Sequence, residues 1–531
     1  MENNSKIRRS ITELQADYDA GNKKPLEDLM RAWKGIKELP ATDPNSFFML
    51  GGFHGEPFRG AGWGNNQYWG GYCNHGNVLF PTWHRVYLFK LELALQSIAG
   101  CSDVMLPYWD ETSPESLKSG IPSALTDETF VLDGQTIPNP LKSFTFPQNI
   151  VDNISGDNPN YSKPLGYETV RYPLSGLVGT PQDIQNTKAH NAQFPDPATN
   201  VDLLNKNIVA WLTSGITVNG KFQPTNVAKA FKDCLNAPNY TVFSNTTSAA
   251  EWNSKAENAK NKVVPLESPH NSIHLAVGGF DIPGADFSPI DGANGDMGEN
   301  DTAGLDPIFY FHHCNVDRVF WLWQKKNGFT ENFDIIPEYP GTNTVDSQGP
   351  TPGMAPNSWL TMDSPLNPFT LTENGSSRPY NSYDCVNIIK MGYDYSKGSL
   401  EDDASPMAKL ESPENTKKLI KITGINRAPV NGSFLISAFA TIDGKREHLG
   451  TEAVLARWNS KYCANCQTHL EARAFFELPE IAAHKNLKLS DLAQTIEVEV
   501  KGRKGLISGN VKNMLLKSDG SPAIRYKVEV V

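Results

Sequence analysis

The chain has 531 residues, of which 39% are hydrophobic and 20% charged, a composition typical of a globular protein. Its length predicts two to four domains, because one hydrophobic core rarely serves more than about 300 residues. The net charge of −11 argues against nucleic acid or an anionic membrane as the main partner. No run of eighteen apolar residues occurs, so no membrane span is expected.

The N-terminal residues read as an amphipathic helix and lack the apolar core of a secretory signal. A cytoplasmic location is therefore expected, provided that no leader was removed. The cysteines form an odd, sparse set that is not typical of a disulfide framework, and most are expected to be buried thiols. They lie at positions 73, 101, 234, 314, 385, 463 and 466.

Helices are predicted over residues 1–50, and their apolar face is formed by Ile11, Leu14, Leu26, Leu29 and Trp33. Residues 51–82 are rich in Gly, Trp and Asn and predict an ordered loop. A helix then follows as far as Gly100, since apolar residues recur at steps of three and four. Residues 103–110 predict a short extended segment.

Residues 111–200 are full of Pro, Asn, Ser and Gly and predict long loops, with one helix over 180–189. Beyond them, Asp306 and Pro307 have the character of a helix N-cap and first helical residue. The further helices are predicted over 200–212, 225–234, 267–277 and 306–326.

The C-terminal quarter changes character. Residues 391–395 predict a last strand of the first domain, which we place at 1–396, and residues 397–415 have the composition of a linker. Apolar and polar residues then alternate with period two in several segments, which predicts strands. We therefore expect a mainly α first domain and an all-β, sandwich-like domain over 416–531, with strands at 433–440, 495–500 and 523–531.

Seven of the eleven histidines fall in two places. His54, His75 and His84 lie in and after the Gly-rich loop. About two hundred residues later, the second cluster follows in two predicted helices: His270, His274, His312 and His313. A lone histidine on an apolar helix is usually a core residue, but this concentration favours a functional site.

His270 and His274 are four residues apart, so they share one helix face and can bind one metal ion. His313 in the next helix can complete a set of three. Imidazole ligands without a carboxylate argue against magnesium, calcium or a facial-triad iron and suit copper or zinc. Two such sets predict a dinuclear centre in the core of a helical bundle.

Both clusters resemble the copper signatures of the tyrosinase and catechol oxidase family, the type 3 copper proteins. The first signature is matched by His75, Phe80, Pro81, Trp83, His84, Arg85, Leu88 and Glu92. The second is matched by Asp306, Pro307, Phe309, Tyr310, His313 and Asp317. The likeness in organisation extends over residues 1–395.

This resemblance implies a four-helix core that holds two copper ions and uses dioxygen as co-substrate. Copper A would be bound by His54, His75 and His84, and copper B by His270, His274 and His313. His312, beside the last ligand, would lie in the surrounding shell. Cys73 would form a thioether bond with His75, as in fungal-type members; the alternative is a buried free thiol.

The implied reaction is ortho-hydroxylation of monophenols and oxidation of o-diphenols to o-quinones, which would place the chain in melanin formation. In tyrosinases a glutamate at the position of Glu267 holds a water and, with the following Asn271, is proposed to help take the phenol proton. The alternative is a structural role for both residues: Glu267 as a favourable acid in the first turn of a helix, and Asn271 as a local hydrogen bonder. Asn300 falls in a segment that resembles the family's gate loop, 297–300, and predicts an altered phenol preference.

Latent members of the family carry a β-rich extension that must be cleaved or displaced, and residues 416–531 resemble it. Tyr393 and Tyr395 resemble the tyrosine motif that ends the catalytic domain and meets an arginine, for which Arg9 is our candidate. Cys463 and Cys466, followed by His469, suggest copper delivery; a disulfide or inert thiols are the alternatives. Trp458 or Tyr462 is expected to fill the substrate pocket.

A latent tyrosinase, with small phenols as substrates and an activating protease as partner, is therefore the expected function. Two alternatives remain. The first is a catechol oxidase without monophenol activity. The second is an oxygen-binding protein like a haemocyanin unit, which pairs the same copper site with a β-rich cover.

Overall fold

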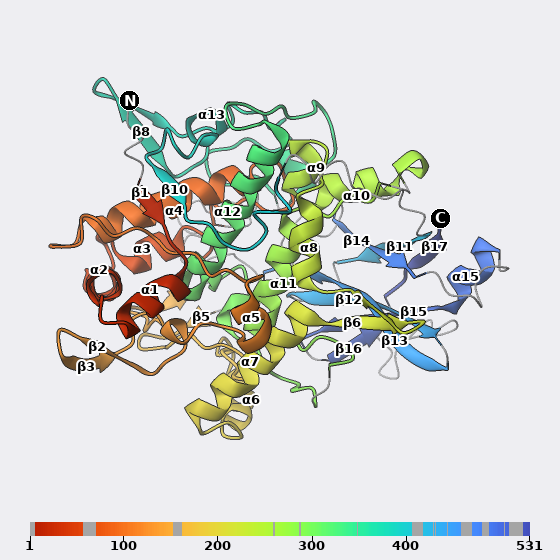
Figure 1. Ribbon diagram of the computed structural model, residues 1–531, viewed down its shortest axis with the longest axis horizontal. Helices are drawn as coiled ribbons and strands as arrows, with labels where there is room; N and C mark the ends of the chain where they lie inside the picture. The colour runs from red at the N-terminus through yellow and green to blue at the C-terminus, as the bar shows by residue number, and fades with distance from the viewer. Residues whose placement is uncertain are drawn as a thin grey trace.

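The computed structural model has a helical part and a β-rich C-terminal part, which lie side by side (Figure 1). This agrees with the predicted fold class. In the part of the chain that the structure describes, no helix is long and apolar enough to cross a membrane. The described residues are 6–56, 71–151, 162–258, 261–285, 288–347, 349–405, 418–427, 430, 432–442, 444–457, 470–479, 488–503, 505–508 and 524–531.

Helices α4 (Phe80–Gln96), α11 (Glu267–Gly278) and α12 (Ile308–Asn327) form the centre of the helical part and are almost fully buried. α12 packs against both α4 and α11. α2 packs on α4, and α7 packs on α11. The surrounding helices are α1 (Ile11–Asp19), α2 (Lys24–Glu38), α3 (Phe47–Gly52), α5 (Pro114–Ser119), α6 (Pro181–Asn191), α7 (Pro197–Thr213), α8 (Val227–Cys234), α9 (Tyr240–Ser244), α10 (Thr246–Ser254) and α13 (Ser382–Cys385).

Local sequence explains where several of these helices begin. The side chains of Thr180, Asp196 and Asn226 accept hydrogen bonds from the first turns of α6, α7 and α8, as N-cap residues do. α12 begins at Ile308, one residue later than predicted, and Pro307 takes the N-cap position instead of Asp306. Asp306 still accepts a hydrogen bond from the Ile308 amide, and its carboxylate also pairs with Arg171.

The ends of the helical part are joined by a parallel pair of strands, β1 (Lys6–Arg8) and β10 (Tyr393–Tyr395). Arg8, not Arg9, meets the tyrosine pair: its guanidinium lies 3.7 Å from the Tyr393 ring centroid and donates to the Tyr395 hydroxyl over 3.1 Å. Arg9 pairs instead with Asp17 at 2.8 Å. The assignment to Arg9 was wrong because successive strand residues point to opposite faces, and Arg8 is the one that faces inward.

The C-terminal strands form two sheets that share one hydrophobic core; we call described residues 418–531 the β part. One sheet has the order β14-β11-β17 and the other β13-β12-β15-β16. Their bounds are β11 (Lys418–Asn426), β12 (Phe434–Ile442), β13 (Lys445–Val454), β14 (Glu471–Leu478), β15 (Ile496–Gly502), β16 (Gly505–Ser508) and β17 (Lys527–Val530), with helix α15 (Leu489–Thr495) before β15.

The two parts share packing. Ile216 and Val218, from the hairpin β6 (Gly215–Val218) and β7 (Lys221–Pro224), belong to the core of the β part. In return Leu435 and Leu455 belong to the core of the helical part. Two short hairpins lie within the predicted loop region 111–200: β2 (Thr129–Leu132) with β3 (Gln135–Pro138), and β4 (Ile150–Val151) with β5 (Ser162–Lys163). A further hairpin pairs β8 (Thr370–Glu373) with β9 (Ser376–Pro379).

Candidate metal centre

The structure brings the histidines of the two sequence clusters into one buried site. His84 lies on α4, His270 and His274 on α11, and His313 on α12. His54 follows α3, and His75 lies in the loop before α4. None of these six side chains is more than 9% exposed.

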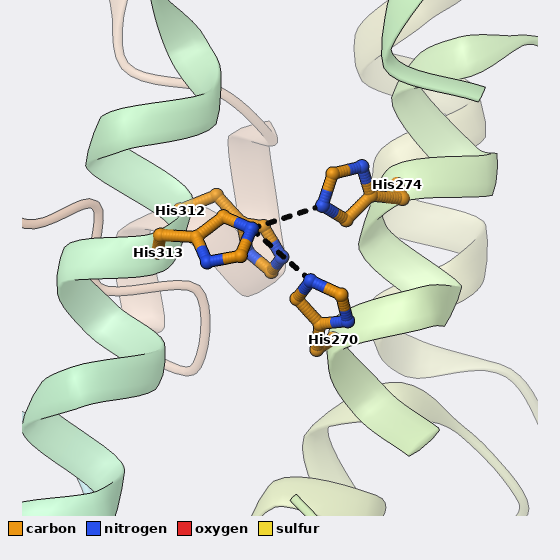
Figure 2. Close-up of side chains that lie close together, drawn as sticks. All are labelled: His270, His274, His312 and His313. Carbon is orange, nitrogen blue, oxygen red and sulfur yellow. Dashed lines mark hydrogen bonds between the residues drawn. The ribbon is translucent and has the colours of Figure 1, made fainter. Parts of the chain in front are cut away.

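In the second set, three Nε2 atoms converge between two helices (Figure 2). The Nε2 atom of His313 lies 3.1 Å from Nε2 of His270 and 3.1 Å from Nε2 of His274. The spacing of four residues on α11 places His270 and His274 on one face, as the sequence predicts. His313, rather than His312, points its Nε2 atom at both of them.

In the first set, the rings of His54, His75 and His84 lie with their centroids 5.1 to 5.7 Å apart. Their Nε2 atoms are buried, and in the described part of the chain none has a hydrogen-bond partner. Buried polar atoms without partners are uncommon in proteins and call for an explanation such as a bound ion.

The two sets face each other across the core. The rings of His84 and His313 stack with centroids 4.5 Å apart, and those of His75 and His270 stack at 5.6 Å. Phe309 lies against His313, with ring centroids 3.9 Å apart, and so limits how far that imidazole can turn. The two sets therefore form one continuous cluster of imidazoles in the core.

Several of the imidazoles are fixed through their other nitrogen. The Nδ1 atoms of His54, His84 and His274 donate to the carbonyl oxygens of Asn300, Phe80 and Met297 at 3.1, 2.8 and 2.8 Å. His270 Nδ1 lies 3.0 Å from the side-chain oxygen of Asn271. Metal-binding histidines are held in this way, with one nitrogen anchored and the other left for the metal.

Burial keeps these histidines neutral. It lowers the pKa of His84 to about 3 and places the pKa of His54, His75, His270, His274 and His313 well below 6.5. A neutral ring with a proton on Nδ1 presents a lone pair at Nε2. In the second set, the lone pairs of His270 and His274 therefore face the same narrow space.

The donor set fits copper. The converging donors are imidazole nitrogens, with the Cys73 sulfur beside the first set. Imidazole and thiolate donors suit copper or zinc and not magnesium or calcium. Positive ions placed among the Nε2 atoms would satisfy the unpaired nitrogens of the first set and the crowded lone pairs of the second.

Comparisons with known proteins decide between the metals. Residues 44–326 match the family model of the common central domain of tyrosinase. The chain belongs to the tyrosinase family. It is 54% identical to a tyrosinase of Hahella sp. (strain CCB-MM4) over 90% of this chain and 89% of that one, and 44% identical to a tyrosinase of Aspergillus oryzae over 94% and 93%.

A solved structure extends the likeness to the whole chain. The tyrosinase from Burkholderia thailandensis is 51% identical, with a TM-score of 0.84 over 99% of this chain and all of that one. The chain is therefore a tyrosinase-type enzyme with a dinuclear copper centre, which oxidises phenols with dioxygen. Neither the catechol oxidase nor the oxygen-carrier alternative is favoured by these matches.

Glu267 lies at the first turn of α11, and both of its carboxylate oxygens accept hydrogen bonds. Its Oε1 atom accepts from the Gly76 amide at 2.7 Å, and Oε2 accepts from the amide and hydroxyl of Thr246 at 2.8 and 3.0 Å. Burial raises its pKa above 4.5. Glu267 thus ties the residue after His75 to the helix that carries His270.

Cys73 lies beside the first set, with its Sγ atom within 4.8 Å of ring nitrogens of His54 and His75. The guanidinium of Arg457 in the β part donates to this sulfur over 3.2 Å. Burial raises the pKa of the Cys73 thiol to about 11. Five cysteines fall within the described residues; all are buried and outside any disulfide there, namely Cys73, Cys101, Cys234, Cys314 and Cys385.

Glu111 is a buried site residue that the sequence did not reveal. Its Oε1 atom lies 2.5 Å from Nδ1 of His312, and its Oε2 atom accepts from Asn315 at 3.1 Å. Burial raises the pKa of Glu111 and lowers that of His312 to about 3, so burial disfavours the charged form of each group. Nothing in the Trp109-Asp110-Glu111 sequence indicates which acid turns inward.

Asn300 is fully buried, and neither polar atom of its side chain has a hydrogen-bond partner in the described part of the chain. Other predicted residues cannot be placed, since Trp458, Tyr462, Cys463, Cys466 and His469 lie outside the described residues. Copper delivery and the plugging aromatic therefore remain predictions.

Proposed function

We propose that two copper ions are held by the six histidines in sets of three, His54, His75 and His84 for one and His270, His274 and His313 for the other. The observation that carries this assignment is the pattern of the ring nitrogens. Nδ1 is anchored in four of the six rings, and the Nε2 atoms are left together in the buried core. The copper pair, when bound, supplies the dioxygen chemistry that hydroxylates a monophenol and oxidises a catechol.

The protein's own groups would prepare the phenol for this reaction, since a phenol must lose its proton before it can bind copper. A carboxylate has about four lone-pair positions, and the Gly76 and Thr246 contacts of Glu267 use three of them. We propose that the remaining one holds a water that takes the phenol proton. Asn271 would act beside it by fixing His270.

We propose that the buried amide of Asn300 contacts the substrate at the mouth of the site. Unpaired buried amides cost free energy, and a hydrogen-bonding substituent on the phenol would relieve that cost at Asn300. Replacement of Asn300 by Val is expected to lower activity toward phenols with polar substituents relative to plain phenols. Unchanged preference would remove this role.

We also propose that Cys73 is joined to His75 by a thioether bond, and that the β part keeps the enzyme latent. The β part lies over the loop that carries Asn300 and reaches Cys73 through Arg457. With it in place the six imidazoles are almost inaccessible. Cleavage within residues 397–415, followed by displacement of the β part, would open the site.

The ligand assignment is tested by copper content after dialysis. The chain is expected to retain two copper ions, whereas His54→Ala and His274→Ala are each expected to retain about one, since each removes a ligand of a different set. His190→Ala is the control, because His190 bonds the Pro173 carbonyl away from both sets. Two firmly bound ions in both ligand variants would contradict the assignment.

A further inference from the structure

One short loop, residues 297–301, touches both sets of histidines. The Met297 carbonyl accepts the hydrogen bond from His274, and the Asn300 carbonyl accepts the one from His54. Each residue of the loop is almost completely buried. The main chain of this loop therefore sets the orientation of one imidazole in each set.

The same loop is held by the β part. The Ser433 hydroxyl and the Arg503 guanidinium donate to the Gly298 carbonyl at 2.8 and 3.0 Å. Arg503 also forms a buried ion pair with Glu299. The backbone N–H of Asn300 donates to the Ala456 carbonyl at 3.3 Å.

Arg457 extends this contact by one more residue. It donates to the Asp301 carboxylate over 3.4 Å and to the Cys73 sulfur over 3.2 Å. Residues 298, 299, 300 and 301 of the loop thus all bond to the β part, through side chains and main chain that are buried at the contact.

The helical part also holds the loop, both at its ends and through the main chain of Glu299 and Asp301. Asp296, just before the loop, accepts from Lys163 at 3.0 Å and from Thr302, just after it, at 2.8 Å. Gly298 packs so closely on Gly278 at the end of α11 that a Cβ atom on Gly278 would lie 2.0 Å from the Gly298 nitrogen. Within the loop, the backbone of Gly298 and Glu299 bonds to Gly295, Asp296 and Ala303. The Gly298 carbonyl, the Glu299 carboxylate and the backbone N–H of Asn300 bond to the β part.

We propose that the β part, besides covering the site, holds the copper ligands in position through loop 297–301 and thereby strengthens copper binding. Arg503 and Ser433 are positioning residues in this account. Loss of their bonds would free the Gly298 carbonyl and the Glu299 carboxylate, loosen the loop, and let His274 and His54 turn. The inference rests on the ligand assignment proposed above.

An equilibrium measurement separates this proposal from a simple lid. A lid that only blocks the way slows copper entry and copper loss alike, so it leaves the equilibrium affinity unchanged. A brace on the ligands changes the affinity itself. Partners that orient metal-bound histidines are worth about 10–100-fold in metal affinity; Arg503 acts one step further out, so we expect a weakening of about threefold to tenfold.

The experiment is competition for copper(I) between the full-length chain and a chromogenic chelator. Arg503→Ala is expected to weaken the affinity, Ser433→Ala to weaken it less, and Arg503→Lys to restore part of it. Lys501→Ala is the control, because Lys501 lies two residues away on β15 and its ammonium group pairs with the exposed Asp291 at 3.6 Å. The visible spectrum of the cobalt(II)-loaded chain is expected to shift in Arg503→Ala and not in the control.

Amide hydrogen exchange of the copper-free chain gives a second readout, in which loop 297–301 is expected to exchange faster in Arg503→Ala and Ser433→Ala. Wild-type affinity and an unchanged cobalt spectrum in both variants would overturn the proposal. Ser433→Ala, which removes only a hydroxyl, keeps the test valid if Arg503→Ala fails to fold. A wild-type chain that binds fewer than two copper ions would instead refute the ligand assignment.

Discussion

Replacement of Glu267 by Gln tests whether its hydrogen bonds hold the site together. Both carboxylate oxygens accept from N–H donors, Gly76 on one side and Thr246 on the other. A glutamine has only one oxygen, so its NH₂ group must face one of these donors. The variant therefore loses at least one hydrogen bond and leaves a buried N–H without an acceptor.

The size of this effect follows from the contacts. A hydrogen bond to a charged group contributes about 1.5–3 kcal/mol to stability, and an unpaired buried donor costs about 1–3 kcal/mol. Against this, glutamine avoids the burial cost that raises the pKa of Glu267. We expect a net loss of about 1–3 kcal/mol.

The assay is chemical unfolding of the copper-free chain, combined with oxygen uptake on a monophenol and a catechol. Glu115→Gln is the control, since Glu115 is an exposed acid in the first turn of α5. A first-turn acid contributes only about 0.3–1 kcal/mol. Equal loss in the two variants would refute the anchoring role of Glu267, and equal loss of monophenol and catechol turnover would refute its role in taking the phenol proton.

Three further predictions concern other parts of the chain. Arg8→Ala leaves Glu92 without its buried partner and is expected to lower the free energy of unfolding by about 3–5 kcal/mol. Arg9→Ala, in a surface ion pair, is expected to lower it by about 1 kcal/mol or less. Similar losses in the two variants would contradict the buried role of Arg8. In the proposed thioether the Cys73 S–H and a ring C–H of His75 give way to an S–C bond, and dioxygen takes up the two electrons and two protons. The chain treated with copper and dioxygen is therefore expected to be lighter by two hydrogen atoms, a loss that Cys73→Ser abolishes; an unchanged peptide mass would refute the thioether. Burial raises the pKa of Glu452, which bonds Ser268, from 4.5 to about 7. The folded chain then holds this proton more tightly than the unfolded chain, so stability falls as pH rises from about 5 to 8, and Glu452→Gln is expected to remove that part of the slope in unfolding midpoints.

The sequence predicts the clustering of the six histidines because much of it is determined locally. The four-residue spacing of His270 and His274 fixes their common helix face, and the long buried helices follow from their apolar periodicity. The C-terminal strands that alternate strictly, such as β15, could be predicted in the same way. The choice of His313 over His312 depended on family spacing.

The rest depends on contacts between distant segments. β12 is buried on both faces, with one residue exposed in nine, so its two-residue pattern is weak. The partnership of Arg8 with residues almost four hundred positions away depends on which face of a three-residue strand turns inward. The bonds from Ser433 and Arg503 to loop 297–301 join segments whose separate sequences give no sign of each other.

Oxygen uptake by the copper-loaded chain, before and after a cut within residues 397–415, tests the central claim most directly. The account predicts little uptake before the cut and, once the β part is displaced, uptake on both a monophenol and a catechol. Because the two parts share packing across Ile216 and Leu435, displacement is checked by gel filtration. A chain that retains two copper ions, has lost the β part and still oxidises neither substrate would contradict the account.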